Sequence, residues 1–355
     1  MQPAAPEISI CPGCGCALEE TSGDGLGCMV CLLRVGIGGE ADVSHDSTLN
    51  DFEGDAHFGV YEIERRENGS LYELGRGAMG TTYRAVDRTL QRSVALKIIK
   101  LGIAGRSAEV RDRFIREARA AAALRHGNIA TVFQFGIREE TGQCFYAMEL
   151  VEGETLEERV RRGGPLDVRA TIEIAQQVTS ALAAAEKRGL IHRDLKPSNL
   201  MLVNADETEE VGTVKIIDFG LAKVLNAPVD PMRLTYSGFV GTPAFASPEQ
   251  FENAALDVRS DIYSLGATLW FALTGKTLFG GHGVEEIHAA QQSNALPIAQ
   301  LKAAHVPFRL GSLLESMLAL QPAARPRPYD LEAKLRHYSA QSRRVRRIRT
   351  LLRFR

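Results

Sequence analysis

The chain has 355 residues, of which 45% are apolar and 24% charged, and its formal net charge is −2. This composition is typical of a globular protein with a full core, and the length allows two or three structural units. No run of eighteen apolar residues occurs, and the first residues lack the basic start and apolar core of a signal peptide. We therefore expect no membrane-spanning helix and no secretory leader.

Two C-x-x-C pairs lie near the N-terminus, separated by thirteen residues: Cys11 with Cys14, and Cys28 with Cys31. Each pair can place two thiolates on one tetrahedral ion, so together they predict a four-cysteine zinc site in segment 1–36, which resembles a small zinc ribbon. The segment is too short for its own core, so the metal would be its main source of stability. Five of the six cysteines lie there, which favours metal in a reducing compartment over disulfides. Free or oxidised cysteines are the alternative.

Residues 37–57 contain six acidic residues and no lysine or arginine. This composition predicts a flexible linker between the cysteine-rich segment and the rest of the chain.

The segment from Leu74 to Gly80 has the pattern G-x-G-x-x-G, formed by Gly75, Gly77 and Gly80. Glycine lacks the β-carbon that would keep backbone N–H groups away from phosphate oxygens. Dinucleotide-binding folds also use this pattern, but there it opens a helix. Because strands are predicted on both sides, at 70–74 and 81–86, we favour a hairpin that covers a nucleotide.

A single lysine, Lys97, lies in the apolar strand predicted at 94–99. Glu117 lies on or beside the apolar face of a helix predicted at 109–124. A carboxylate there is costly unless it is paired. We therefore expect an ion pair between Lys97 and Glu117 that orients the lysine toward the α- and β-phosphates. In isolation, Lys97 would instead be read as a surface lysine on an edge strand.

A loop at 191–199 holds Asp194, Lys196 and Asn199 within six residues, and a second acidic turn follows at Asp218. Aspartate and asparagine side chains so spaced can hold a substrate hydroxyl and Mg²⁺ beside a nucleotide's terminal phosphate. Such a turn could arise for structural reasons alone. The glycine-rich segment and the lysine strand precede it in the order that a phosphoryl-transfer site requires, which favours the functional interpretation.

Taken together, these motifs resemble those of bacterial, eukaryotic-like Ser/Thr protein kinases, over most of the chain. The resemblance implies an α+β, two-lobed kinase domain at 58–338, with ATP in the cleft between the lobes. The β-rich N-lobe would cover about 58–151 and the helical C-lobe about 152–338. A basic tail would follow at 339–355.

By this resemblance, Asp194 is the catalytic aspartate that accepts the proton of the substrate hydroxyl. Lys196 would stabilise the transferring phosphate, and Lys97 and Glu117 complete the catalytic set. Asn199 and Asp218 would ligate Mg²⁺, as oxygen donors for a hard cation.

The resemblance also predicts the ATP pocket. Leu74 and the three glycines would cover the nucleotide, together with the residues that meet the adenine: the backbones of Glu149 and Val151, and the side chains of Ala95 and Met201. The chain departs from the family at Thr82, where valine is usual, which thins the apolar roof of the pocket.

Lys196 and the segment 241–245 resemble Ser/Thr rather than tyrosine kinases, so the expected substrates are protein serine and threonine hydroxyls. Glu249 and Arg325 are expected to pair, and Asp261 is expected to brace the loop at 191–199, called the catalytic loop below. An enlarged acidic segment between 202 and 215 is most simply a longer surface hairpin.

Thr235 and Ser237 lie in a predicted loop between Asp218 and Glu249, and we hypothesise that they are autophosphorylated. A phosphate there could pair with Arg193 and order the loop. An ordinary Ser/Thr-rich loop is the alternative.

Eight arginines and no acidic residue lie between Arg336 and the C-terminus, with apolar residues interleaved at roughly helical spacing. Such a segment can bind an anionic membrane surface, although a solvated helical extension explains it equally well. The chain could be a truncated receptor kinase or a cytoplasmic kinase with a basic tail. A protein partner for the cysteine-rich segment is favoured over nucleic acid, because that segment carries little basic charge.

Two functions from different classes are therefore considered. The first is a bacterial signalling kinase that uses Mg²⁺ and ATP. The second is an ATP-binding interaction scaffold with weak activity. The complete set of catalytic residues favours the kinase.

Overall fold

The computed structural model describes residues 9–10, 17–18, 56–77, 80–99, 108–138, 143–203, 211–219, 242–252, 256–281, 283–293 and 295–338. The chain divides into two compact units, Met1–Asp55 and Ala56–Arg355. In the first unit, β1 (Ser9–Ile10) pairs antiparallel with β2 (Ala17–Leu18). The four predicted zinc ligands, the linker up to Asp55 and the basic tail lie outside the described residues.

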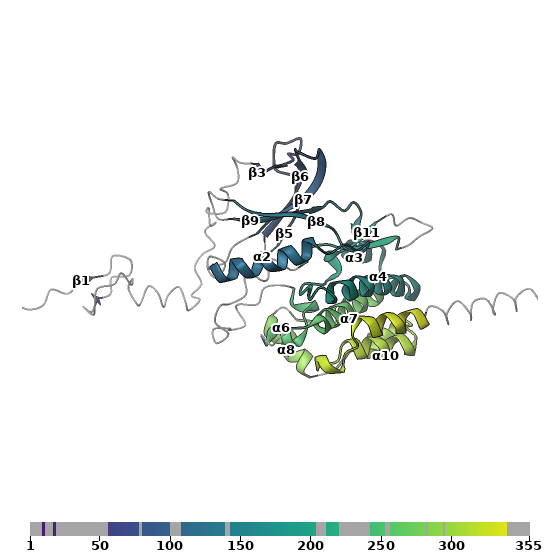
Figure 1. Cartoon of the computed structure of the whole chain (residues 1–355). Coiled ribbons are helices and arrows are strands. Elements are labelled where there is room, and N and C mark those ends of the chain that lie inside the picture. The colour runs from purple at the N-terminus through teal and green to yellow at the C-terminus, as the bar shows by residue number, and fades with distance from the viewer. Residues whose placement is uncertain are drawn as a thin grey trace, which may run out of the picture. The chain divides into compact units, whose positions relative to one another are not determined.

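The N-lobe is an antiparallel sheet with the order β3-β4-β6-β7-β9-β8, and β5 pairs with β6 off this path (Figure 1). Its strands are β3 (His57–Phe58), β4 (Tyr61–Ile63), β5 (Glu73–Gly77), β6 (Gly80–Asp87), β7 (Arg92–Ile99), β8 (Val132–Ile137) and β9 (Cys144–Glu149). β7 is buried over its last six residues. Both faces of the sheet are therefore covered along β7, the strand predicted to carry Lys97 among apolar residues.

The glycine-rich segment forms the hairpin β5–β6, in which Gly77 pairs with Gly80. β5 begins and ends three residues later than the strand predicted at 70–74, because the first two glycines take part in the pairing. At Gly80, φ is +142°, and a β-carbon would lie 2.1 Å from the carbonyl oxygen of Ile98. Only glycine allows β6 to approach β7 this closely.

Helix α2 (Ala108–Ala122) agrees with the predicted helix to within two residues. Ala118 and Ala121 are buried, and the helix packs against β8. In Figure 1, α2 lies between the N-lobe sheet and the C-lobe helices. Side chains on α2 can therefore reach both lobes.

The C-lobe is mostly helical and carries a small antiparallel sheet, β10-β11-β12. Its helices are α3 (Leu156–Gly163), α4 (Val168–Glu186), α6 (Pro248–Phe251), α7 (Val258–Thr274), α8 (Val284–Gln292), α9 (Ile298–Ala303), α10 (Phe308–Met317) and a last helix at 328–338. Its strands are β10 (Glu154–Thr155), β11 (Leu200–Val203) and β12 (Thr213–Ile216). β11 and β12 pair antiparallel on either side of the predicted acidic hairpin, whose residues 204–210 lie outside the described part of the chain.

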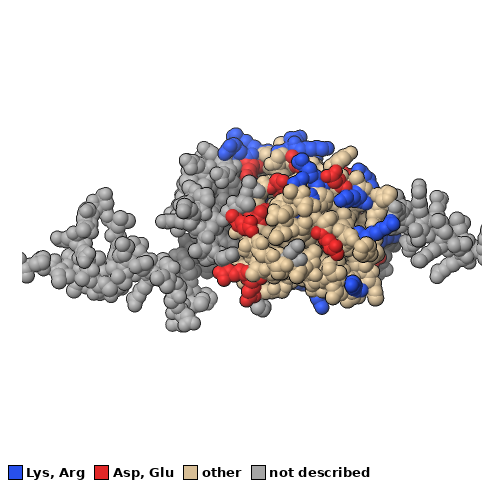
Figure 2. Space-filling view, turned by 90° about the horizontal axis from the view of Figure 1, so that it is seen from below, with Lys and Arg blue, Asp and Glu red and all other residues tan. Residues whose placement is uncertain are grey.

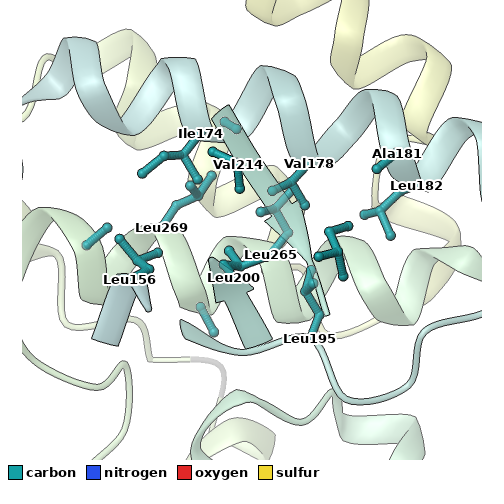
Figure 3. Packing of buried hydrophobic residues seen from close by; sticks show 14 of the residues in the cluster. Leu156, Ile174, Val178, Ala181, Leu182, Leu195, Leu200, Val214, Leu265 and Leu269 are labelled. Carbon is teal, nitrogen blue, oxygen red and sulfur yellow. The ribbon is translucent and has the colours of Figure 1, made fainter. Parts of the chain in front are cut away.

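Helix α7 forms the centre of the C-lobe core. Asp257 caps its N-terminus by accepting a hydrogen bond from the Arg259 N–H, and Gly275 ends it with φ of +69°. Figure 3 shows Leu265 and Leu269 of α7 packed with side chains of α4 and with Leu195 of the catalytic loop. Leu195 is 1% exposed, so core packing fixes the loop that carries the predicted catalytic residues.

The predicted two-lobed fold, with a β-rich N-lobe and a helical C-lobe, is thus confirmed. Among the residues that the structure describes, no helix is both long and apolar enough to cross a membrane.

Candidate active site

Asp261, in the first turn of α7, holds the backbone of the catalytic loop. Its carboxylate oxygens accept hydrogen bonds from the N–H groups of His192 (2.7 Å) and Arg193 (2.8 Å). Arg193 has φ of +65°, a left-handed conformation that disfavours a residue with a β-carbon. The two hydrogen bonds stabilise this strained turn, and the predicted bracing role of Asp261 is confirmed.

Asp194, Lys196 and Asn199 form one polar network. The Lys196 ammonium lies 3.0 Å from Asp194 Oδ2 and donates to Thr242 Oγ1 at 3.1 Å. Asn199 Nδ2 donates to the Asp194 carbonyl oxygen at 2.8 Å. Asp194 and Asn199 are buried, so the carboxylate is held in one place with a cation beside it. Such an arrangement can accept a proton while the lysine stabilises negative charge on a phosphate.

Asp218 follows β12 in the second acidic turn, which lies beside this network because the preceding Ile217 N–H donates to the Asn199 carbonyl oxygen at 2.9 Å. Its backbone is also left-handed, with φ of +62°. The next residue, Phe219, is buried and packs on the His192 ring with centroids 4.8 Å apart. Asp218 Oδ2 accepts a hydrogen bond from the Lys97 ammonium, and Oδ1 accepts one from the Tyr146 hydroxyl.

The expected Lys97–Glu117 ion pair is wrong for this structure. Lys97 pairs with Asp218, and Glu117 accepts two hydrogen bonds from the Arg193 guanidinium, at 2.9 and 3.1 Å. The planar fork of arginine matches a carboxylate with two parallel bonds, which a single ammonium cannot do. The pairing therefore joins α2 to the catalytic loop rather than to β7.

A cavity of about 360 Å³ lies beside this ion pair. It is lined by α2 residues (Arg116, Glu117 and Ala120) and by the start of the catalytic loop (Gly189, Leu190, Ile191 and Arg193). Two arginines and one carboxylate thus face a common space next to the catalytic loop.

Most of the predicted ATP-binding residues lie on strands of the N-lobe sheet, whereas Met201 lies on β11 of the C-lobe. Thr82 and Lys97 are opposite each other in the β6–β7 pair, and Ala95 is opposite Met148 in the β7–β9 pair. Ala95 and Met201 are buried, whereas Leu74 is 44% exposed at the glycine-rich hairpin.

Glu149, at the end of β9, uses its side chain to join the two lobes. Its carboxylate pairs with Lys215 of β12 at 2.7 Å and accepts the Thr131 N–H at 3.2 Å. Its backbone N–H donates to the Thr131 carbonyl oxygen at 2.9 Å. These contacts hold Glu149 in place at the start of the segment that links the lobes.

Tyr146 is a functional candidate that the sequence patterns did not reveal. It is 1% exposed, and burial, followed by the charge of Asp218, raises the pKa of its hydroxyl well above the ordinary value. β9 is buried on both faces up to Met148, so its sequence shows no polar alternation that would single out Tyr146. A buried tyrosine needs a hydrogen-bond partner for its hydroxyl, and that requirement was the only available signal.

The expected pair of Glu249 and Arg325 is confirmed. The Arg325 guanidinium donates to both oxygens of Glu249, at 2.6 and 2.9 Å, and Ser260 Oγ donates to Oε1 at 2.6 Å. Burial alone would raise the pKa of Glu249, but the hydrogen bonds and charge of Arg325, with Ser260, outweigh it and lower the pKa. The pair stabilises the C-lobe away from the reacting groups.

Several predicted residues lie outside the described part of the chain. They are the proposed phosphorylation sites Thr235 and Ser237 and the zinc ligands Cys11, Cys14, Cys28 and Cys31. Among the described residues, no group of three or more histidine, cysteine or acidic side chains could hold a metal ion.

Fold and site together define a protein kinase, and comparison with known families agrees. The model of the protein kinase domain matches residues 70–337, about three quarters of the chain. The chain therefore belongs to the protein kinase family.

Three similar proteins are bacterial Ser/Thr protein kinases. The chain is 37% identical over 257 residues to pkn3 of Myxococcus xanthus, covering 71% of this chain and 46% of that protein. It is 36% identical over 259 residues to PknK of Mycobacterium tuberculosis (72% and 22%) and 33% identical over 268 residues to PrkC of Bacillus subtilis (75% and 39%). The chain thus spans less than half of the length of these three relatives.

Among solved structures, the kinase domain of Mycobacterium tuberculosis PknI is similar with a TM-score of 0.59 and 25% identity, over 79% of this chain and 97% of that one. Rad53 in complex with AMP-PNP is similar with a TM-score of 0.60 and 25% identity, over 77% and 64%.

Proposed function

We propose that this protein is a bacterial signalling kinase that transfers the γ-phosphate of ATP to protein serine and threonine hydroxyls. The observation that carries the proposal is the network of Asp194, Lys196 and Asn199. It offers a fixed carboxylate for the hydroxyl proton and an ammonium for the phosphate. The Lys196 ammonium donates a hydrogen bond to Thr242. The resemblance to Ser/Thr kinases rests on these two positions, so their contact supports serine or threonine as the phosphate acceptor.

The residues present fit Mg²⁺ and ATP. Asn199 and Asp218 offer amide and carboxylate oxygens, the donors that Mg²⁺ prefers. The Asn199 amide nitrogen already donates to the Asp194 carbonyl, so the amide oxygen is the end available to a cation. When bound, Mg²⁺ would neutralise charge on the phosphates. Lys97 would bind the α- and β-phosphates, and the hairpin of Gly75, Gly77 and Gly80 would cover them.

The test is phosphate transfer from labelled Mg·ATP to the protein itself and to a mixed peptide substrate. Wild-type protein should label serine and threonine, and Asp194→Asn should lower the rate at least about 100-fold. Equal and negligible labelling of both proteins would instead favour the ATP-binding scaffold.

The proposed phosphorylation of Thr235 and Ser237 gains support from Arg193. Its guanidinium binds Glu117 beside a cavity that Arg116 also lines, so a phosphate on the loop would compete with Glu117 for Arg193. Phosphopeptide mapping of active protein should find both residues modified, and an active protein unmodified at both would refute this.

The zinc proposal for Cys11, Cys14, Cys28 and Cys31 is supported by the β1–β2 hairpin. Its two strands bracket residues 11–16, which include the first C-x-x-C pair. Natively purified, reduced protein should contain about one zinc per chain. A content near zero would remove the zinc-ribbon interpretation of segment 1–36.

The basic tail 339–355 is proposed to bring a cytoplasmic kinase to anionic membranes. On the face shown in Figure 2, lysine and arginine side chains gather along the upper edge with acidic side chains among them, and much of the remaining surface is uncharged. The eight arginines between Arg336 and Arg355, with no acidic residue among them, support the tail as the candidate for such binding. Protein should sediment with vesicles containing anionic lipid but not with neutral vesicles, and equal sedimentation would oppose the proposal.

A further inference from the structure

Tyr146 and Lys97 share the carboxylate of Asp218, and only one of them carries a charge. The Lys97 ammonium donates to Oδ2 and the Tyr146 hydroxyl to Oδ1. Both donors are buried, Lys97 at 6% and Tyr146 at 1% exposure. Each oxygen of the acidic group therefore has its own donor.

The sheet fixes where these two donors lie. Lys97 of β7 and Tyr146 of β9 are directly opposite each other in the antiparallel pair. Opposite residues of a strand pair project from the same face of the sheet. Both side chains consequently reach Asp218 from one rigid platform.

The two donors differ in what they can do once a cation is present. A lysine ammonium beside Mg²⁺ adds like charge, and Lys97 is expected on the nucleotide phosphates. The tyrosine hydroxyl is neutral, and its ring has only two side-chain torsions, both restricted by burial. It can therefore keep its hydrogen bond to Asp218 while the carboxylate also meets a metal ion. Hydrogen bonds to a ligating carboxylate of this kind orient it and raise metal affinity.

We infer that Tyr146 is a positioning residue for Asp218: its hydroxyl fixes one carboxylate oxygen so that the other is presented to the Mg²⁺ bound with ATP. The inference rests on the proposed Mg·ATP-dependent function. It adds a residue from β9, distant in sequence from both predicted metal ligands, to the metal site. It also explains why a hydroxyl is present in a strand that is otherwise apolar on this face.

The test is the Mg²⁺ dependence of ATP binding, measured by calorimetry in EDTA and across a Mg²⁺ titration. In Tyr146→Phe the ring remains and one oxygen is removed. We expect ATP affinity in EDTA to stay within about twofold of wild type, while the Mg²⁺ concentration for half-maximal tightening rises roughly tenfold. A Mg²⁺ midpoint equal to or below that of wild type would overturn the inference.

Tyr61→Phe is the matched control. Tyr61 is also buried in the N-lobe sheet, and its hydroxyl donates to Gln134 Oε1 at 2.9 Å, away from the site. It should lose a comparable amount of thermal stability without moving the Mg²⁺ midpoint. An equal rise in both variants would mean that loss of any buried hydroxyl in this sheet is sufficient, and the inference would fail.

A double-mutant cycle separates this inference from the proposed function and from misfolding. If Tyr146 acts through Asp218, Tyr146→Phe should have no further effect on Mg²⁺ dependence in an Asp218→Asn background. A full additional effect there would contradict the inference. Wild-type protein whose ATP binding ignores Mg²⁺ altogether would refute the proposed function itself, whereas a normal wild-type response with an unshifted Tyr146→Phe refutes only the inference.

Discussion

Glu249 and Arg325 lie 76 positions apart in the sequence, yet their side chains form two hydrogen bonds and are only 6% and 0% exposed. Removing one charge from such a pair leaves the other charge buried without its partner. A solvent-exposed ion pair contributes little to stability, because water screens the charges and ordering the long side chains costs entropy. Burial therefore decides what each ion pair contributes to stability.

Glu249→Gln should lower the free energy of unfolding by about 3 kcal/mol, because the Arg325 guanidinium keeps its charge and loses its counter-ion. Urea unfolding at neutral pH measures this. The control is Glu173→Gln, which removes an i,i+4 pair with Arg169 whose side chains are 42% and 72% exposed. It should cost less than about 0.5 kcal/mol. Similar losses in both variants would contradict the argument from burial.

At the scale of elements, the contact between β6 and β7 depends on Gly80. An alanine there would place its β-carbon against the Ile98 carbonyl and would keep a positive φ. We expect Gly80→Ala to lower stability by at least about 1 kcal/mol and to weaken ATP binding, because the hairpin must move. Gly77→Ala is the control for stability, since open space surrounds its β-carbon position. If both variants are equally stable, the close approach at Gly80 is not limiting.

The connection between α2 and β8 is anchored by His126. Its Nδ1 accepts the Asn128 N–H at 3.1 Å, and its Nε2 lies 3.2 Å from Ser180 Oγ of α4. Burial lowers the pKa of His126, and the charge of Glu332 opposes this only in part. The bond from Asn128 requires an unprotonated Nδ1, so the folded state favours the neutral ring.

This arrangement predicts a pH dependence of stability. Below about pH 6.5 the unfolded chain binds a proton at His126 more readily than the folded protein does, so stability falls as the pH is lowered through this range. Urea unfolding between pH 8 and pH 5.5 should show this decline, with a shallower slope in His126→Gln. An unchanged slope in the variant would assign the decline to other histidines.

At the scale of the whole molecule, the proposed nucleotide site takes groups from both lobes. The glycine-rich hairpin and Lys97 belong to the N-lobe, whereas Asn199 and Asp218 belong to the C-lobe. A ligand that binds only this folded arrangement stabilises it by mass action.

Mg·ADP at about 100 times its dissociation constant should therefore raise the free energy of unfolding by about 2.7 kcal/mol. Thermal unfolding with and without ligand measures the effect. Asp218→Asn should respond much less to Mg·ADP than wild type at the same concentrations. Equal responses in both proteins would show that the metal does not contribute through Asp218.

Strong local patterns made much of the fold predictable. The apolar strand around Lys97, the amphipathic helix with Glu117 and the apolar run that ends at Gly275 each carry their own periodicity or stop signal. The contact of Asp261 with the catalytic loop and the pair of Glu249 with Arg325 could also be predicted from the sequence, because the resemblance to the kinase family assigns roles to these positions. The start of β5 could not be predicted, since pairing with β6 decides which glycines belong to the strand.

The sequence by itself determined the family, the order of the motifs and the chemical types at the site, because local spacing and residue chemistry suffice for these. Only the tertiary structure decided which charges meet. Glu117 pairs with Arg193, Lys97 with Asp218, and Tyr146 joins them, because strand register and helix placement set distances between residues up to 121 positions apart. No local pattern encodes those distances, since each charged group pairs with the best-placed partner that packing leaves within reach.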